Sequence, residues 1–208
     1  MIHSEDEARE YVAQRCDQAA FARLERFVEH LVRENAHQNL VSRGTLGAMW
    51  QRHIADSAQL LDYVEEPSEP WLDLGTGAGL PGVVIAAMRS EWTVVLVESR
   101  RRRIEWLNTI VAKLELRNCR VEGQRLERVE AFPAGVISAR AFAPLLKLLD
   151  LSARFSTSRT QWVLPKGKGA AQELAELPRR FGRMFHVEQS QTSPDAGIIV
   201  GTLKMRKS

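Results

Sequence analysis

Cysteine is scarce in this sequence, and its scarcity excludes two kinds of site. Cys16 and Cys119 are the only cysteines in 208 residues, and they lie far apart in unrelated contexts. Two such residues cannot supply a disulfide framework or a cysteine-rich zinc site. No apolar run approaches the roughly 20 residues of a membrane-spanning helix, and residues 4–7 are polar or acidic where a signal peptide is apolar. We therefore expect a cytoplasmic protein with no membrane segment and no metal.

Net charge is small as well. The 29 Lys and Arg residues exceed the 26 Asp and Glu residues by a formal +3, and 44% of the chain is hydrophobic. This composition excludes intrinsic disorder, which needs low hydrophobicity and high net charge. The length suits one substantial core and is short for two full domains. A surplus of +3 does not by itself indicate nucleic-acid binding, so the placement of the basic residues matters more than their number.

The first third of the chain has a helical pattern. Apolar residues recur at three- and four-residue steps over residues 5–35, which predicts two amphipathic helices, the second capped by Asp17. A further helix is expected over residues 46–63, and prolines then restart the chain. We expect residues 1–66 to form an N-terminal helical extension that packs on the core of the remaining chain as one structural unit.

Residues 67–208 alternate between short apolar runs and helical patterns. The expected strands are residues 71–74, 93–97, 119–122, 135–138 and 161–164, and the expected helices are residues 83–88, 101–116, 145–155 and 169–180. Residues 185–188 and 198–203 flank a turn-rich segment typical of an antiparallel hairpin. This order predicts an α/β, Rossmann-like domain with a doubly wound, mostly parallel sheet and an antiparallel C-terminal edge.

A glycine-rich loop is the strongest local signal. Residues 73–82 read Asp-Leu-Gly-Thr-Gly-Ala-Gly-Leu-Pro-Gly, between an expected strand and an expected helix. Gly77, Gly79 and Gly82 match the G-x-G-x-x-G spacing of a dinucleotide site, but the longer pattern, from Asp73 through Gly75, Gly77 and Gly79, is that of Rossmann-like methyltransferases. There an acidic side chain binds the amino group of S-adenosylmethionine, directly or through water. A simple helix-capping turn is the third interpretation.

Glu98 supplies the acidic partner of this loop. It ends the next expected strand, about 20 residues after the glycines, where a carboxylate can accept hydrogen bonds from both ribose hydroxyls of a nucleotide. Both S-adenosylmethionine and a nicotinamide dinucleotide carry a ribose, so Glu98 does not separate them. Chain length separates the two cofactors, because a dehydrogenase needs a substrate domain or a second mononucleotide-binding half, and little of the chain remains for either. Methyl transfer is favoured over hydride transfer.

Four arginines, residues 100–103, follow directly at the start of the next expected helix. Positive charge there opposes the helix dipole, so a solvated helix start explains the run poorly. Contact with RNA phosphates explains it better, because guanidinium groups bind phosphate oxygens in bidentate fashion. Arg125 and Lys166 are further candidates for this basic face. Lys204, Arg206 and Lys207 are better explained as ordinary surface charge.

Two more polar segments carry candidates. Residues 52–57 read Arg-His-Ile-Ala-Asp-Ser, and His53 shares a helix face with Asp56 or Ser57. A lone histidine in such a place is more often structural than catalytic, and no third metal ligand occurs at a suitable spacing. Arg140 follows an expected strand at the edge where parallel sheets bind ligands, which makes it a functional candidate.

Taken together, these residues resemble the RsmG (GidB) family, which methylates N7 of a guanine in small-subunit (16S) ribosomal RNA. The Gly-Leu-Pro-Gly ending of the glycine loop and the Arg-His-x-x-Asp-Ser block are the most specific parts, and the resemblance covers about residues 39–168. The other matching segments are Asn39-Leu40, Glu98-Ser99, Gln124-Arg125 with Glu127, residues 136–142 and Lys166-Gly167. Two departures are Glu98, where aspartate is common, and an extra residue between Ser138 and Arg140.

The resemblance implies roles for individual residues. It implies a cofactor site that includes Gly75, Leu80, Leu126, Glu127 and Arg140, in addition to Asp73, Gly77, Gly79 and Glu98 of the motifs described above. It implies that Asn39, His53, Arg102, Arg103, Arg125, Arg140 and Lys166 face RNA or the reacting guanine, and among these we expect Arg140, Lys166, Asn39 and His53 to be catalytic. The implied cofactor is S-adenosylmethionine, and the implied partner is 16S ribosomal RNA, within the small ribosomal subunit or a precursor of it.

The chemistry agrees with one further absence. Guanine N7 has an in-plane lone pair that is unprotonated at neutral pH, so it attacks the sulfonium methyl group without a general base, and positioning supplies the catalysis. The sequence accordingly lacks the Asn-Pro-Pro-aromatic motif that methyltransferases of exocyclic amines use. Two alternatives stay open from the residues themselves: an NAD(P)-dependent Rossmann reductase and a non-enzymatic RNA- or ribosome-binding module.

Overall fold

The computed structural model describes residues 1–203, apart from the side chain of Arg180. Lys204, Arg206 and Lys207 lie outside the described residues. Within residues 1–203 no helix combines the length and the apolar character needed to cross a membrane. The same residues contain no group of three or more His, Cys, Asp or Glu side chains arranged to hold a metal ion.

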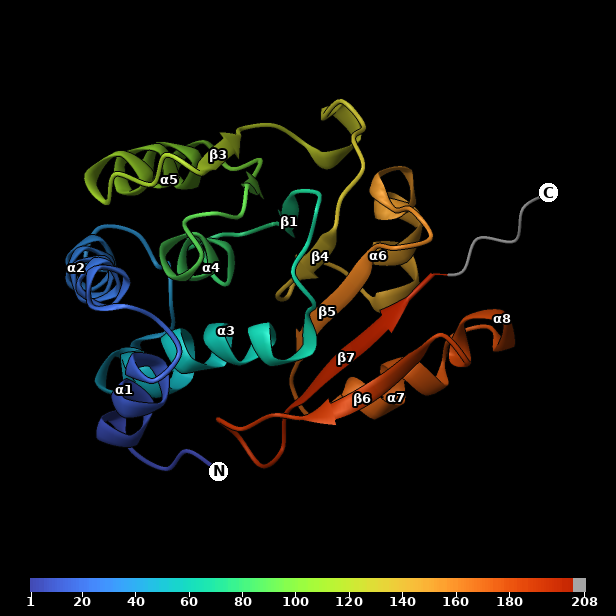
Figure 1. The fold of residues 1–208 in the computed structure, drawn as a ribbon, viewed down its shortest axis with the longest axis horizontal. Coiled ribbons are helices and arrows are strands. Elements are labelled where there is room, and N and C mark those ends of the chain that lie inside the picture. Colours follow the sequence, from blue (N-terminus) through green and yellow to red (C-terminus); the bar gives the residue numbers. More distant parts are fainter. Residues whose placement is uncertain (204–208) are drawn as a thin grey trace.

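A single seven-stranded sheet organises the fold, with the strand order β3-β2-β1-β4-β5-β7-β6 (Figure 1). Its strands are β1 (Trp71–Leu74), β2 (Val94–Val97), β3 (Cys119–Glu122), β4 (Val136–Ala139), β5 (Gln161–Lys166), β6 (Phe185–Gln189) and β7 (Gly197–Thr202). The first five run parallel, and β7 pairs antiparallel with both β5 and β6. The sequence prediction of a mostly parallel sheet with an antiparallel C-terminal edge is confirmed.

Alternation along the buried strands divides the core into two clusters, one on each face of the sheet. Trp71 of β1 and Leu96 of β2 belong to the first cluster, whereas Leu72 and Val95 belong to the second. This period of two is the geometry of a strand that is buried on both faces. Every residue of β1, β2 and β4 is buried, which explains why each was visible in the sequence as a short continuous apolar run.

Helices cover both faces. On the first face lie α4 (Gly82–Met88) and α5 (Arg101–Lys113), and on the second lie α6 (Leu145–Ser152) and α7 (Ala170–Ala175), with α8 (Arg179–Gly182) following α7. Three predicted helices prove shorter than expected, and the one over residues 101–116 ends at Lys113. The helix over residues 145–155 becomes a 3-10 turn at residue 153, and the helix over residues 169–180 is interrupted before Pro178, because the residue before a proline is driven out of the helical conformation.

The N-terminal helices share the first core cluster. The structure confirms α1 (Glu5–Ala13) and α2 (Gln18–Glu34), with the Asp17 side chain accepting a hydrogen bond from the Ala20 N–H at 2.7 Å. Phe27 and Leu31 of α2 pack in the same cluster as Val83 and Ile85 of α4. This contact supports our expectation that residues 1–66 pack on the core of residues 67–208. The description of the two parts as one structural unit stays a prediction.

The expected helix over residues 46–63 is irregular. It consists of a 3-10 helix (Arg43–Ala48), a π-helix (Trp50–Ala55), the short α3 (Asp56–Ala58) and a second 3-10 helix (Gln59–Tyr63). The Glu5 carboxylate accepts hydrogen bonds from the Trp50 and Gln51 N–H groups at 2.9 and 2.8 Å, and so fixes where the π-helix begins. Such π segments are rare and occur at functional sites, and this one carries Arg52 and His53.

Candidate functional site

The glycine loop follows β1 at the carboxyl edge of the parallel strands, where sheets of this kind bind ligands. Gly75, Gly77 and Gly79 have φ values of +63°, +59° and +96°, a region that side-chain-bearing residues rarely adopt. A Cβ added to Gly75 would lie 2.5 Å from Phe142, and one added to Gly77 would lie 3.2 Å from Arg103 Nη1. The glycines are therefore needed both for the turn and for the close approach of these groups.

Asp73 fixes this loop from below. Its side chain is fully buried, and its two carboxylate oxygens accept hydrogen bonds from Ser138 Oγ at 2.8 Å and from the Gly82 N–H at 3.0 Å. Burial raises the pKa of this carboxyl group, and the two hydrogen bonds oppose that shift. Asp73 lines neither of the two cavities described below. The geometry therefore gives it a bracing position under the loop, and its direct contact with the cofactor stays a prediction.

Glu98 reaches the loop from the end of β2. Its Oε2 accepts a hydrogen bond from the Gly77 N–H at 3.2 Å, and its Oε1 accepts from the Ser99 and Arg100 N–H groups at 2.7 and 2.9 Å. Arg103 Nη1 lies 3.8 Å from the same carboxylate. The Glu98 side chain thus ties the glycine loop to the first turn of α5.

A cavity of about 230 Å³ lies beside this carboxylate. We call it the Glu98 cavity, and it is lined by Gly75, Val97, Glu98, Ser99, Arg100, Arg103, Gln124, Leu126, Ala141 and Phe142. Leu126 gives it an apolar wall, and the glycine backbone gives it a floor. A carboxylate, an apolar wall and exposed backbone are the groups that recognise the ribose, the base and the tail of a nucleotide-like ligand.

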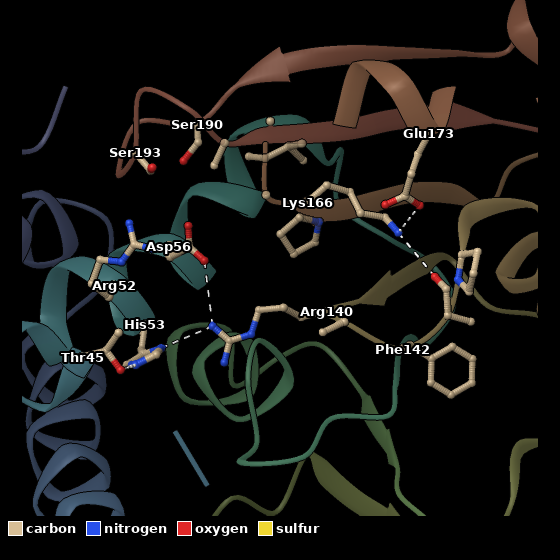
Figure 2. A pocket seen from close by; sticks show the side chains of 18 residues that line it. Thr45, Arg52, His53, Asp56, Arg140, Phe142, Lys166, Glu173, Ser190 and Ser193 are labelled. Carbon is tan, nitrogen blue, oxygen red and sulfur yellow. Dashed lines mark hydrogen bonds and ion pairs between the residues drawn. The ribbon is translucent and has the colours of Figure 1, made fainter. Parts of the chain in front are cut away.

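A second, larger pocket of about 650 Å³ lies between the π-helix, the end of β4, the end of β5 and the start of β7. We call it the Arg140 pocket. Figure 2 shows the Arg140 guanidinium between His53 and Asp56, with Lys166 and Glu173 on the other side. Arg140 Nη1 lies 3.3 Å from His53 Nδ1 and 3.9 Å from Asp56 Oδ2. Burial lowers the pKa of the Arg140 guanidinium, and the negative charges of Asp56 and Asp73 oppose the shift.

The contacts of His53 define its tautomer. A guanidinium only donates, so Arg140 donates to Nδ1, and Nε2 carries the proton and donates to Thr45 Oγ1 at 2.8 Å. Burial, followed by the charges of Arg140 and Arg52, lowers the pKa of His53 to about 3. His53 is therefore a neutral, fixed ring that orients Arg140, and it cannot act as a cation towards RNA near neutral pH.

His53 predicts an acid-sensitive fold. The folded-state pKa lies below the unfolded value, so the unfolded state binds the proton first and stability falls as pH drops below about 6.5. Between about pH 6.5 and pH 5 the folded protein should lose roughly 2 kcal/mol from this residue alone. Urea unfolding of the wild type and of His53→Asn at a series of pH values gives the free energy of unfolding against pH for each protein. The difference between the two slopes measures the contribution of His53. Parallel stability curves for the two proteins would contradict the prediction.

Lys166 enters the Arg140 pocket from the end of β5, but its charge is balanced inside the protein. Its Nζ donates to Glu173 Oε2 at 2.8 Å and to the Ala143 carbonyl at 3.4 Å, and its side chain is only 9% exposed. Glu173 also accepts a hydrogen bond from the Leu145 N–H at 3.0 Å. This ion pair ties β5, α7 and the start of α6 together at the wall of the pocket.

Ala141 and Phe142 connect the two cavities, because both residues line each of them. Ala141 has φ +52°, an uncommon conformation for a residue with a side chain. Strained backbone of this kind is concentrated at active sites and ligand clamps. The segment after Arg140 therefore contributes to the lining of both cavities, which places the two cavities next to each other.

The structure does not bring every predicted site residue to these cavities. Gly75, Glu98 and Leu126 line the Glu98 cavity, and His53, Arg140 and Lys166 line the Arg140 pocket. Leu80 is buried in the first core cluster, and Asn39, Arg125 and Glu127 are exposed and line neither cavity. Arg103 lies in the Glu98 cavity, whereas Arg102 points into a separate groove. The roles implied for these residues stay predictions.

Several pocket residues were missed by sequence reasoning. Thr45 and Glu173 gave no local signal, since one lies in a short 3-10 helix and the other on an ordinary amphipathic helix. Asp56 was weighed only as a neighbour of His53, but it also accepts hydrogen bonds from Thr192 Oγ1 at 2.7 Å and Gln59 Nε2 at 2.9 Å. Thr192 lies in the loop between β6 and β7, so this contact closes the pocket from a segment that is distant in sequence.

Comparison with known proteins decides the family. Residues 20–194 match the family described as "GidB: rRNA small subunit methyltransferase G". The chain belongs to this family. It is 62% identical to the ribosomal RNA small subunit methyltransferase G of Erythrobacter litoralis, over 97% of each chain. It is also 56% identical to the protein of that name from Sphingopyxis alaskensis, over 88% of this chain and 78% of the other.

Solved structures agree on the fold of this GidB family member. A putative S-adenosyl-L-methionine-dependent methyltransferase from Methanococcus maripaludis superposes with a TM-score of 0.58 at 10% identity, covering 86% of this chain and 93% of the other. The precorrin-6y C5,15-methyltransferase of Geobacter metallireducens gives 0.54 at 13% identity, covering 80% and 92%. The expected Rossmann-like methyltransferase fold is confirmed.

Proposed function

We propose that this protein transfers a methyl group from S-adenosylmethionine to N7 of a guanine in 16S ribosomal RNA. The observation that carries the proposal is the pair of cavities at the carboxyl edge of the sheet, joined through Ala141 and Phe142 in a chain of the GidB family. One cavity has the groups for a nucleotide-like cofactor, and the other is large enough for a purine. Methyl transfer needs this arrangement, because donor and acceptor must meet in line.

The residues of the Glu98 cavity fit the cofactor. The carboxylate of Glu98 would accept from ribose, Leu126 would pack against adenine, and the backbone of Gly75, where an added Cβ would meet Phe142, would lie against the methionine part. When bound, S-adenosylmethionine supplies an activated methyl group on a sulfonium. Asp73 would act through the loop that it braces, since its carboxylate already accepts from Ser138 and Gly82.

In the Arg140 pocket this chain's residues position the base rather than exchange protons with it. Guanine N7 needs no general base, and the neutral His53 agrees with that chemistry. Arg140 is held by His53 and Asp56, which leaves further guanidinium N–H groups to donate to the O6 of guanine or to a phosphate. The ion pair with Glu173 holds Lys166 in place as part of the pocket wall.

Mapping N7-methylguanine in small-subunit RNA from cells with and without the gene tests this function. We expect one modified guanine to disappear in the deletion strain and to return when the wild-type gene is supplied. An Arg140→Ala gene, which removes the guanidinium but keeps the Glu98 cavity, should fail to restore it. An unchanged map of N7-methylguanine in the deletion strain would contradict the proposal. Testing free RNA, a precursor particle and the assembled subunit in vitro then identifies the form of substrate.

Two measurements separate the two rival functions. A reductase would bind NADPH rather than S-adenosylmethionine, which calorimetry with each ligand distinguishes. A non-enzymatic RNA-binding module would keep its RNA affinity and its biological effect when Asp73 under the glycine loop is replaced by Ala, whereas a methyltransferase would lose the effect together with its cofactor. Both the cofactor and the ribosomal RNA substrate of the proposed reaction occur in the cytoplasm, so we place the protein there as part of the same proposal.

A further inference from the structure

A third cavity lies away from the two described above. It is a groove of about 620 Å³ between α2 and α5, two helices that lie side by side at the same face of the sheet (Figure 1). We call it the α2–α5 groove. Its basic side chains are His30, Arg33 and His37 from the end of α2 and the turn after it, and Arg102 and Lys113 from α5. It shares no lining residue with the Arg140 pocket or the Glu98 cavity.

The carboxylates in the groove are already engaged. Glu34 accepts a hydrogen bond from Gln38 Nε2 at 2.7 Å, and Glu105 pairs with Arg101 at 2.9 Å. Arg33 pairs with the exposed Glu29, at 3.8 Å. Among residues 1–203 neither Arg102 nor Lys113 is paired with a carboxylate. The positive charges of Arg102 and Lys113 therefore face solvent without an internal partner.

His30 gives a second indication of positive potential. Burial lowers the pKa of this histidine, and the charges of Lys113, Arg33 and Arg26 lower it further, while Glu29 opposes the shift. A side chain in an ordinary mixed-charge surface would feel no such surplus of cations from two helices. An anion in the groove would be attracted to the cations that disfavour a proton on His30.

The spacing along α5 indicates an extended anion. Arg102 and Lys113 are eleven residues apart, which places them three turns apart on nearly the same helix face and about 16 Å apart along the axis. Trp106 and Thr109 line the groove between them. A single phosphate cannot reach both cations, whereas a chain of phosphates can. Nucleic acid backbone is a polyanion that is long enough to span this distance.

The groove is also connected to the cofactor side of the protein. Trp106, which lines it, donates from Nε1 to the Ala78 carbonyl of the glycine loop at 3.0 Å. Gln38, another lining residue, donates to the Arg102 carbonyl at 3.4 Å and so ties the end of α2 to the first turn of α5. Trp106 and Gln38 thus link the groove to the glycine loop and to the first turn of α5.

We propose that the α2–α5 groove is a second RNA contact, which binds the phosphate backbone of the substrate away from the nucleotide that is methylated. This inference rests on the proposed function and adds a docking surface to it. Backbone contacts supply affinity and orientation without reading sequence. The groove then sets the direction in which RNA crosses the protein, while the Arg140 pocket accepts the target base.

A triple variant, Arg33→Ala/Arg102→Ala/Lys113→Ala, tests the groove. Its matched control is Lys147→Ala/Arg159→Ala/Arg183→Ala, which removes the same formal charge from exposed positions that line neither the groove nor the two site cavities. Binding of a small-subunit ribosomal RNA fragment is measured over a salt series. We expect the groove variant to bind the RNA fragment about tenfold or more weakly than the wild type. The slope of log affinity against log salt concentration should become less steep by about three.

The control triple should keep nearly the wild-type slope, and both variants should bind S-adenosylmethionine like the wild type. A charge-conserving variant, Arg33→Lys/Arg102→Lys/Lys113→Arg, should restore RNA affinity, which separates contact from folding. An equal loss of RNA affinity in the two triple-alanine variants, or no loss of RNA affinity in the groove variant, would overturn the inference. If the wild type binds the fragment but methylates no RNA, the proposed function fails instead. The comparison of the two triple-alanine variants still shows whether the groove binds RNA.

Discussion

Arg103→Ala should bind S-adenosylmethionine about ten- to a hundredfold more weakly than the wild type, the loss expected for a charged hydrogen bond, whereas Arg102→Ala should bind it normally. The two neighbours face different cavities, since Arg103 lies 3.8 Å from Glu98 and against Gly77, and Arg102 points into the α2–α5 groove. Calorimetry with purified variants measures both affinities. For RNA affinity the same two variants should show the reverse order, because Arg102→Ala should lose more affinity for RNA than Arg103→Ala.

The chemistry of the ligand separates two roles for Arg103. If its guanidinium binds the carboxylate of the cofactor's methionine part, Arg103→Ala should leave the affinity for methylthioadenosine, which lacks that carboxylate, unchanged. If Arg103 only steadies Glu98, both ligands should lose affinity to the same extent. Arg103→Lys is the matched control, because it keeps a positive charge without the planar fork. Normal cofactor binding by Arg103→Ala would contradict both roles and return Arg103 to the RNA face.

The pair of arginines also shows where sequence reasoning ends. The prediction that the run at residues 100–103 begins a helix is confirmed, and the contact of these arginines with RNA phosphates stays a prediction. Consecutive helical residues point about 100° apart, however, so one run supplies different surfaces. Only the packing of α2 against α5 and the position of Glu98 show which arginine faces which cavity.

The fold itself was predictable because its signals are local. The strands β1, β2 and β4 are buried throughout and appear in the sequence as apolar runs, and the glycines with positive φ stand where the chain must turn sharply. The Arg140 pocket was only partly predictable. The two partners of Arg140, His53 and Asp56, belong to a recognisable sequence block. Thr45 contacts His53, Glu173 contacts Lys166 and Thr192 contacts Asp56, and these three residues come from segments far apart in sequence. Such contacts depend on tertiary packing and leave no periodic pattern.

Asp73→Ala should destabilise the folded protein by about 3 kcal/mol and abolish measurable cofactor binding, because two buried donors lose their acceptor. The Gly82 N–H at the start of α4 has no other partner in the loop, and Ser138 Oγ donates to Asp73 while it accepts from Trp71 Nε1 at 2.8 Å. Urea unfolding and calorimetry with S-adenosylmethionine measure the two effects. The expected loss of affinity arises from the glycine loop, since Asp73 lines neither cavity.

Asp73→Asn is the matched control, since it keeps the volume and one carbonyl acceptor. Burial raises the pKa of Asp73 in the folded state, so the folded protein favours the protonated form and loses stability relative to a neutral side chain as pH rises. The stability difference between wild type and Asp73→Asn should therefore be larger in acid and shrink towards neutral pH. If Asp73→Asn binds the cofactor as the wild type does and Asp73→Ala does not, the carboxylate acts by bracing the loop. Loss of binding in Asp73→Asn, with a stable fold, would instead show that its charge acts on the amino group of the cofactor.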